Sequence, residues 1–139
     1  MNAPLYTAEI LRLAASLKEP RRLEREDGRA ELRSKTCGSR VTMSVMLDCD
    51  RRVLATSQVV HACAFGQASC ALLEQGAPGR SRDEIDAALN EITGWLGGGE
   101  VEPDWPAILA LAPARSRPSR HGAILLPFRA LLQAMDPRG

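Results

Sequence analysis

The sequence has no long hydrophobic run, no internal repeat and few aromatic residues, which make up 4% of its 139 residues. The longest strongly apolar run, residues 123–128, is much shorter than the ~20 residues that a membrane-spanning helix needs. Residues 1–10 have no basic region followed by an apolar stretch, so we expect no secretion signal. These absences predict a cytoplasmic protein without a membrane partner.

Positive charge is not in excess either, because 18 lysine and arginine residues face 17 aspartate and glutamate residues, giving a formal net charge of +1. Nucleic-acid-binding proteins use surplus cations to neutralise phosphates, so we expect no nucleic-acid partner. Hydrophobic residues reach 45% of the chain, which is enough for a substantial core. The length fits one domain, residues 1–139.

The four cysteines contain no Cys-x-x-Cys pair, which excludes zinc ribbons and thioredoxin-type redox sites. In a reducing cytosol, cysteines are thiols or metal ligands more often than disulfides. A site that uses two of them must therefore be assembled by the fold from remote segments. The cysteines are Cys37, Cys49, Cys63 and Cys70.

The periodicity of apolar residues changes twice along the chain. Residues 6–18 have apolar positions three or four apart and predict a helix, which Pro20 ends. Residues 30–34, 41–47 and 53–60 alternate or are rich in β-branched side chains, and they predict three strands. The last half returns to helical spacing. This order predicts an α+β fold, with a three-stranded antiparallel sheet and helices packed on one face.

The helices of the last half are bounded by recognisable signals. Residues 63–75 predict a helix, and the capping box Ser81-Arg82-Asp83-Glu84 opens another that three glycines end at 97–99. We expect Asp104 to cap a short helix through Leu111, and residues 113–120 to form a basic loop. In the final helix, Pro127 should fall in the first turn or cause a kink.

Short connections between the predicted strands favour a meander. Pairing around the turn at 48–51 places Leu47 opposite Arg52 or Val53, and the same register brings Cys37 opposite Cys63. Their strands would then lie ~5 Å apart. Cys63 also begins a helix, whose N-terminus stabilises an anionic thiolate. Two thiols at one end of the sheet indicate a soft-metal site.

The other candidate ligands are less well defined by sequence. Cys49 lies in the opposite turn, and Cys70 lies ~10 Å along the helix from Cys63, so we expect a surface residue and a core residue. His61 comes two residues before Cys63, and His121 follows the basic loop. The residues alone leave the remaining ligands open.

Several segments nevertheless occur in a characteristic order. Residues 6–11 and then Glu19-Pro20-Arg21 are similar to an N-terminal helix with an Asn-Pro-Arg turn, and Thr36-Cys37-Gly38-Ser39 is similar to a Cys-Gly-Asp loop. Residues 62–71 are similar to the segment around a second cysteine. Residues 79–84 are similar to a Gly-Lys-Ser/Thr-x-x-Glu helix start, and residues 120–125 to a His-Cys-Ser-Ile-Leu stretch. The chain thereby resembles the NifU/IscU/SufU-type iron–sulfur cluster assembly scaffolds.

The resemblance implies a SufE/NifU-like fold and a scaffold, not an enzyme, that binds iron as a transient [2Fe–2S] cluster, or zinc. The implied partners are a cysteine desulfurase and apo iron–sulfur recipient proteins, and the implied ligands are Cys37, Cys63 and His121. The family's third cysteine aligns with Gly122, and its aspartate aligns with Ser39. Clusters are typically held by thiolates. The fourth position would therefore fall to Ser39, His61, water or a second subunit.

Two other interpretations compete with the scaffold. The loop at Cys37, with Arg40 able to favour a thiolate, also resembles that of the SufE-type sulfur acceptors, which carry a persulfide on one cysteine. A degenerate family member that only binds partners is the third. The basic loop could dock an acidic patch on a partner through Arg115, Arg117 and Arg120. Trp95 and Trp105 are expected to be packing residues.

Overall fold

A three-stranded antiparallel sheet in the order β1-β2-β3 forms one layer of the computed structural model, which describes residues 6–35 and 38–137. The alternation of burial is complete on β2, where the residues facing the core are at most 4% exposed. The predicted sheet is confirmed. Its strands are β1 (Gly28–Arg33), β2 (Arg40–Leu47) and β3 (Val53–His61).

The register of the β2–β3 pair agrees with the prediction near the turn and differs by one residue beyond it. Leu47 lies opposite Val53 as expected. An irregularity between Met46 and Leu47 then shifts the pairing, so that Arg40 lies opposite His61. A bulge inserts one unpaired residue and accounts for the shift. β2 therefore begins, shortly after residue 37, at the same end of the sheet where β3 finishes and the chain continues to Cys63.

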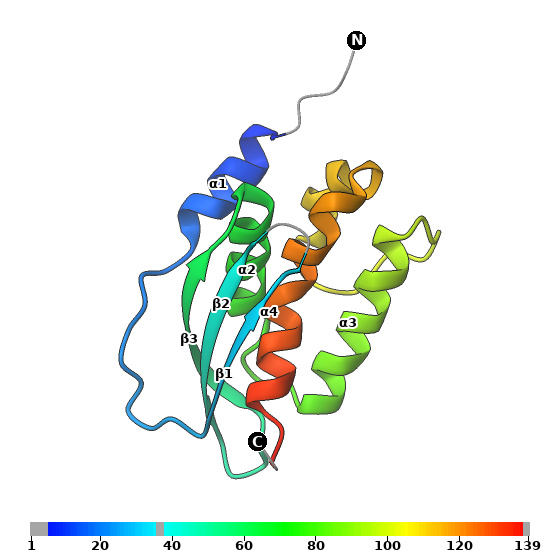
Figure 1. The fold of residues 1–139 in the computed structure, drawn as a ribbon. Helices are drawn as coiled ribbons and strands as arrows, with labels where there is room; N and C mark the ends of the chain where they lie inside the picture. Colours follow the sequence, from blue (N-terminus) through cyan, green and yellow to red (C-terminus); the bar gives the residue numbers. More distant parts are fainter. Residues whose placement is uncertain (1–5, 36–37, 138–139) are drawn as a thin grey trace.

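The helices cover one face of the sheet (Figure 1), as predicted. On that face, α2 packs against β3 and α4 packs against β1 and β2. The first helix, α1, lies on α2, while α3 packs on the side of α4. The helices are α1 (Ala8–Ser16), α2 (Ala64–Gly76), α3 (Arg82–Leu96) and α4 (His121–Ala134), with 3₁₀ segments η1 (Ile108–Ser116) and η2 (Pro118–Arg120).

Local capping explains where two of the helices begin. The hydroxyl of Thr7 accepts a hydrogen bond from the Ile10 N–H at the start of α1. The predicted capping box of α3 is present, with Ser81 and Glu84 bonding each other's backbone N–H groups. The same helix ends at Gly97, as expected, and Gly98 follows with a φ of 105°, a conformation that glycine adopts without strain.

The segment between α3 and α4 corrects the sequence prediction. No helix begins at Asp104, because Ala107 has a φ of 63° and interrupts any helical run there. Residues 108–116 and 118–120 form 3₁₀ turns instead of a short helix followed by a loop. Pro113 lies inside η1, where its missing N–H is compatible with short turns but not with a long helical ladder.

The last helix, α4, is the central element of the core. It continues through Pro127, which lies well past its first turn and is buried. Pro127 is therefore not a first-turn proline, and the other alternative, a kink in the helix, stays a prediction. Trp95 and Trp105 are 3% and 4% exposed, which confirms that they are packing residues. Among the described residues, no helix has the length and apolar character needed to cross a membrane.

Candidate metal centre

The N-termini of α2 and α4 lie side by side at one end of the molecule. A Cβ added to Gly66 would lie 3.4 Å from the Cβ of Ala123, so the two helices approach closely at this point. One turn further on, the Ser69 hydroxyl donates a 2.6 Å hydrogen bond to the Ile124 carbonyl. Because this contact is near the first turn of both helices, it brings the residues that begin them to the same end of the fold.

Cys63 is the N-cap residue of α2. Its backbone is extended, with φ −68° and ψ 173°, and its side chain does not cap the helix by a hydrogen bond. The thiol is free and half-buried, and the first turn of α2 contains no acidic residue. The sulfur therefore lies at the positive end of the helix dipole, where an anionic ligand is stabilised.

His121 is the first residue of α4 and points back toward η1. Its Nε2 lies 2.8 Å from the carbonyl oxygen of Ala114. A carbonyl can only accept a hydrogen bond, so Nε2 donates, which leaves the Nδ1 lone pair available in the neutral ring. Metal-ligating histidines usually donate their other ring N–H to a carbonyl or carboxylate in this way. His121 thereby keeps Nδ1 as the ring nitrogen that carries a lone pair, and its role as a metal ligand stays a prediction.

Cys37, the other predicted thiolate ligand, lies outside the described residues, so its distance from Cys63 stays a prediction. The described residues on either side of it, between β1 and β2, are joined by backbone hydrogen bonds. The Ser34 N–H donates to the Ser39 carbonyl at 2.8 Å, and the Gly38 N–H donates to the Ser34 carbonyl at 3.3 Å. Ser39 itself is 3% exposed.

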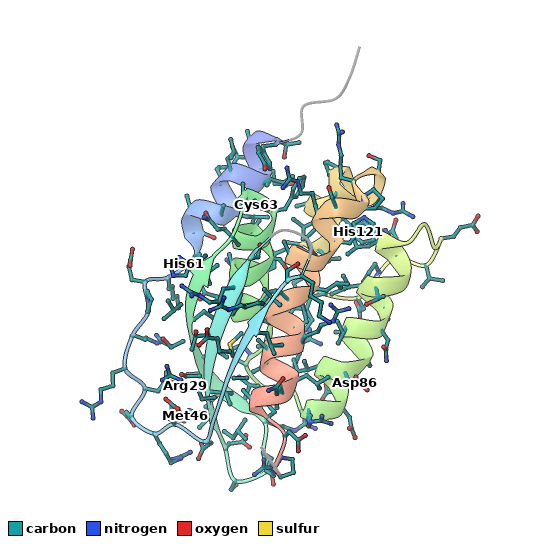
Figure 2. The ribbon with its side chains drawn as sticks, in the orientation of Figure 1. Arg29, Met46, His61, Cys63, Asp86 and His121 are labelled. Atoms are coloured by element: carbon teal, nitrogen blue, oxygen red, sulfur yellow. The ribbon has the colours of Figure 1, made fainter. Side chains whose placement is uncertain are left out.

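His61 is an exposed residue at the end of β3. Figure 2 shows it on the sheet side of the molecule, whereas His121 lies at the start of α4. Within residues 6–35 and 38–137, no three histidine, cysteine, aspartate or glutamate side chains are grouped closely enough to hold a metal ion. The described residues therefore do not complete a metal site, and the roles of Ser39 and His61 as further ligands stay predictions.

The three arginines of the predicted docking loop differ in their surroundings. Arg115 donates hydrogen bonds to the carbonyls of Trp95 (2.9 Å) and Gly99 (2.7 Å), and its guanidinium lies 5.2 Å from the Trp95 ring centroid. It thereby ties η1 to the end of α3. Arg117 is exposed and Arg120 is half-buried, so these two are accessible to a partner.

Sequence reasoning missed a cavity of about 370 Å³ beside Gly122. Three of its lining residues are cations, although the chain as a whole is nearly neutral. Arg129 follows Gly122 by two helical turns, and this spacing could have revealed their shared face. The lining residues are Leu32, Arg33, Ser34, Lys35, Gly122, Leu126 and Arg129.

The remaining cysteines lie where the sequence predicts. Cys49 is exposed in the turn between β2 and β3, at the opposite end of the sheet. Cys70 is fully buried, and this burial raises the pKa of its thiol far above the ordinary value. Its thiolate is therefore inaccessible at neutral pH, and Cys70 acts as a small core residue.

Comparison with known proteins finds solved structures that are similar to this chain. No model of a known protein family and no curated protein matches the sequence. The crystal structure of the N-terminal part of a nitrogen-fixing NifU-like protein from Brucella abortus is similar, with TM-score 0.85 and 30% identity over 96% of this chain and 93% of that one. A putative iron–sulfur cluster assembly scaffold protein for the SUF system from Fervidobacterium islandicum AW-1 shares the fold, with TM-score 0.84 and 22% identity over 95% and 97% of the two chains. The chain therefore belongs to the family of NifU N-terminal-like proteins.

Proposed function

We propose that this protein is a scaffold on which a [2Fe–2S] cluster is assembled as cargo and then passed to other proteins. The observation that carries the proposal is the adjacent pair of helix N-termini, which begin at Cys63 and His121. Family membership supports it, and the structurally similar protein from Fervidobacterium islandicum is described as such a scaffold. The protein would hold its cargo without catalysing a reaction.

In this proposal the cargo is bound by the thiolates of Cys37 and Cys63 and by Nδ1 of His121. Gly122 offers no side chain, and His61 is exposed on the outer face of the sheet, so the fourth position falls to Ser39, water or a second subunit. A site with three protein ligands leaves one position open to exchange, which suits a protein that must release its cargo. The same ligands suit zinc with one open position. A site of free thiols requires a reducing compartment, so we place the protein in the cytoplasm.

The proposed partners are a cysteine desulfurase, which supplies sulfur, and apo iron–sulfur proteins, which receive the cluster. Arg117 and Arg120 lie just before His121 and supply positive charge beside the site. An acidic patch on a partner would be attracted to them and oriented toward the cargo. Arg115 contributes less, because its guanidinium already binds two carbonyls of this chain.

The zinc and iron contents of the purified protein test the proposal. We expect Cys63→Ser to lose most of the metal that the wild type retains. Cys49→Ser is the matched control, since Cys49 is an exposed thiol remote from the site, and it should retain the wild-type content. Equal metal contents in the wild type and Cys63→Ser would contradict a site that uses Cys63.

A second candidate is sulfur transfer by a persulfide on Cys37, and it is favoured by Arg40, which begins β2 three residues after Cys37 and supplies a positive charge that stabilises a thiolate. The Cys37 thiolate would attack the outer sulfur of a desulfurase persulfide, forming a new S–S bond and releasing the desulfurase cysteine as a thiolate. Mass spectrometry after incubation with the desulfurase and cysteine separates the candidates. Sulfur transfer would be favoured over the scaffold if Cys37 carries a persulfide in protein without bound metal. The Cys63→Ser variant should then carry the same persulfide.

A further inference from the structure

Two arginines and a histidine form a row across the outer face of the sheet, at the end where the candidate site lies. Arg33 of β1 lies directly opposite Arg40 of β2, and Arg40 lies directly opposite His61 of β3. Residues paired in this way share one face of an antiparallel sheet. The neighbouring row, whose Val41 is 1% exposed, faces the helices. Arg33, Arg40 and His61 therefore face away from the core.

The fold does not compensate this row. Like charges directly opposite each other destabilise a sheet. The nearest carboxylate, that of Glu31, lies 3.9 Å from the Arg33 guanidinium, and the two side chains are 51% and 70% exposed, so their attraction is weak. In the described part of the chain, Arg40 and His61 form no ion pair. The row therefore has a cost for the free protein that a negatively charged partner would remove.

Positive charge continues along the same face. Arg29 lies in the row of Ser44 and Ser57, and these three residues line a cavity of about 520 Å³ beneath the connection between α1 and β1. That connection adds three arginines, Arg21, Arg22 and Arg25, to the lining of the cavity, together with two glutamates, Glu24 and Glu26. The outer face is thus richer in cations than the chain as a whole, whose net charge is +1.

Negative charge gathers on the far side of the molecule. The helix α3 carries four carboxylates against the single cation Arg82, although one of the four, Glu84, is paired with Arg52. The carboxylates are those of Asp83, Glu84, Asp86 and Glu91. Figure 2 shows Arg29 on the sheet and Asp86 on α3, on opposite sides of the helix layer. Because the two signs are separated, the outer sheet face presents a positive field that the net charge conceals. A partner with an acidic surface would be steered toward this face.

We propose that Arg33, Arg40 and His61 form a docking surface for an acidic patch on the cysteine desulfurase that supplies sulfur. This inference rests on the proposed scaffold function. The row ends at His61, two residues before Cys63, so a donor docked there is held at the end of the sheet that leads to Cys63. Arg33 and His61 are exposed and Arg40 is half-buried, so the row is accessible to a partner.

The test is the affinity of the purified full-length protein for a purified cysteine desulfurase, measured by calorimetry at low and high salt. The double variant Arg33→Gln/Arg40→Gln should bind about tenfold more weakly at low salt and lose part of the salt dependence. The matched control, Arg12→Gln/Arg51→Gln, removes two exposed cations away from the row and should bind like the wild type.

The outcomes separate this inference from the proposed function. If the wild type does not bind the desulfurase, the proposed function fails and the inference fails with it. If the wild type and the double variant bind equally, the docking surface is wrong and the scaffold stands. If the double variant loses binding only to an apo recipient protein, the assignment to the desulfurase is overturned.

Thermal unfolding of the free chain provides a second measurement. Because Arg33 and Arg40 are like charges that lie opposite each other, they should not stabilise the free protein. Arg33→Gln/Arg40→Gln should therefore unfold at the same temperature as the wild type or a higher one. A lower unfolding temperature would show that the arginines stabilise the fold, and the docking assignment would then be wrong.

Discussion

Gly66 of α2 and Ala123 of α4 are in contact at the point where the two helices begin. A Cβ at residue 66 would lie 2.7 Å from the Cβ of Ala62 and 3.4 Å from that of Ala123. We therefore expect Gly66→Ala to destabilise the protein by ~1–3 kcal/mol, because the helix start must shift to relieve the overlap. The same shift would move Cys63 relative to His121 and lower metal content. Chemical denaturation and metal analysis check both effects.

Gly94→Ala is the matched control for that substitution. Gly94 lies inside α3, and a Cβ added there meets nothing within 4 Å. Alanine should therefore stabilise the protein by ~0.5–1 kcal/mol, because it restricts the unfolded chain and favours the helix. If Gly66→Ala is as stable as Gly94→Ala, the close approach of α2 and α4 is not a real constraint.

A substitution at His121 can separate the structural hydrogen bond of its side chain from metal ligation. His121→Gln keeps an N–H donor that can reach the Ala114 carbonyl but lacks the imidazole Nδ1. We expect the unfolding midpoint to stay near that of the wild type while zinc affinity, measured by chelator competition, falls about 10- to 100-fold. Unchanged zinc affinity in this variant would exclude His121 as a ligand.

Arg115 and Arg117 are expected to respond differently to the same substitution. Arg115→Ala removes one of the two donors to the Trp95 carbonyl, which keeps the Gly98 N–H, and the side-chain donor to the Gly99 carbonyl, and it should lower the free energy of unfolding by ~1–3 kcal/mol. Arg117→Ala removes an exposed side chain and should leave the free energy of unfolding unchanged while weakening desulfurase binding. Equal stabilities of the two variants would contradict the structural role of Arg115.

The carboxyl group of Glu84 makes the stability of the fold depend on pH. Its hydrogen bond from Arg52, and then those from Ser81, lower the pKa of the carboxyl below its ordinary value of 4.5. A lowered pKa stabilises the fold above 4.5, and this contribution is lost as the pH falls through the folded-state pKa. The unfolding midpoint of Glu84→Gln should therefore lie below that of the wild type at neutral pH.

Thermal melts across acidic pH check the sign. The difference between wild type and Glu84→Gln should shrink as the pH falls and disappear once Glu84 is protonated in both states. Asp83→Asn, on the same helix turn, is the control, because in the described part of the chain the Arg52 and Ser81 bonds go to Glu84 and none goes to the Asp83 carboxylate. A difference that grows toward low pH would be opposite to the expected sign.

The strands and α3 could be predicted because their signals are local. Alternating burial on β2 and the capping box at Ser81 depend on residues within one element. The segment after Asp104 could not be predicted, because tertiary contacts decide its path. Trp105 donates from Nε1 to the Leu72 carbonyl at 2.9 Å and packs on Gly76, where no Cβ would fit. These contacts fix the chain before η1 in a way that helical periodicity cannot indicate.

The site was predictable only in part for the same reason. The meander and its turn were enough to predict that Cys63 lies at the end of the sheet where β2 begins after residue 37. A bulge shifts the register of that pairing by one residue. The contact between Gly66 and Ala123 and the bond from His121 to Ala114 join segments that are packed by the whole core. Chain spacing carries no information about them.

The most direct test of the proposed scaffold is anaerobic reconstitution with ferrous iron, cysteine and a cysteine desulfurase, followed by visible absorption and analysis of bound iron and sulfide. The wild type and Cys49→Ser should bind iron and sulfide in equal amounts and show the absorption of a [2Fe–2S] cluster, while Cys37→Ser and Cys63→Ser should show neither. A wild type that binds no cluster, or a Cys63→Ser variant that binds as much as the wild type, would contradict the account.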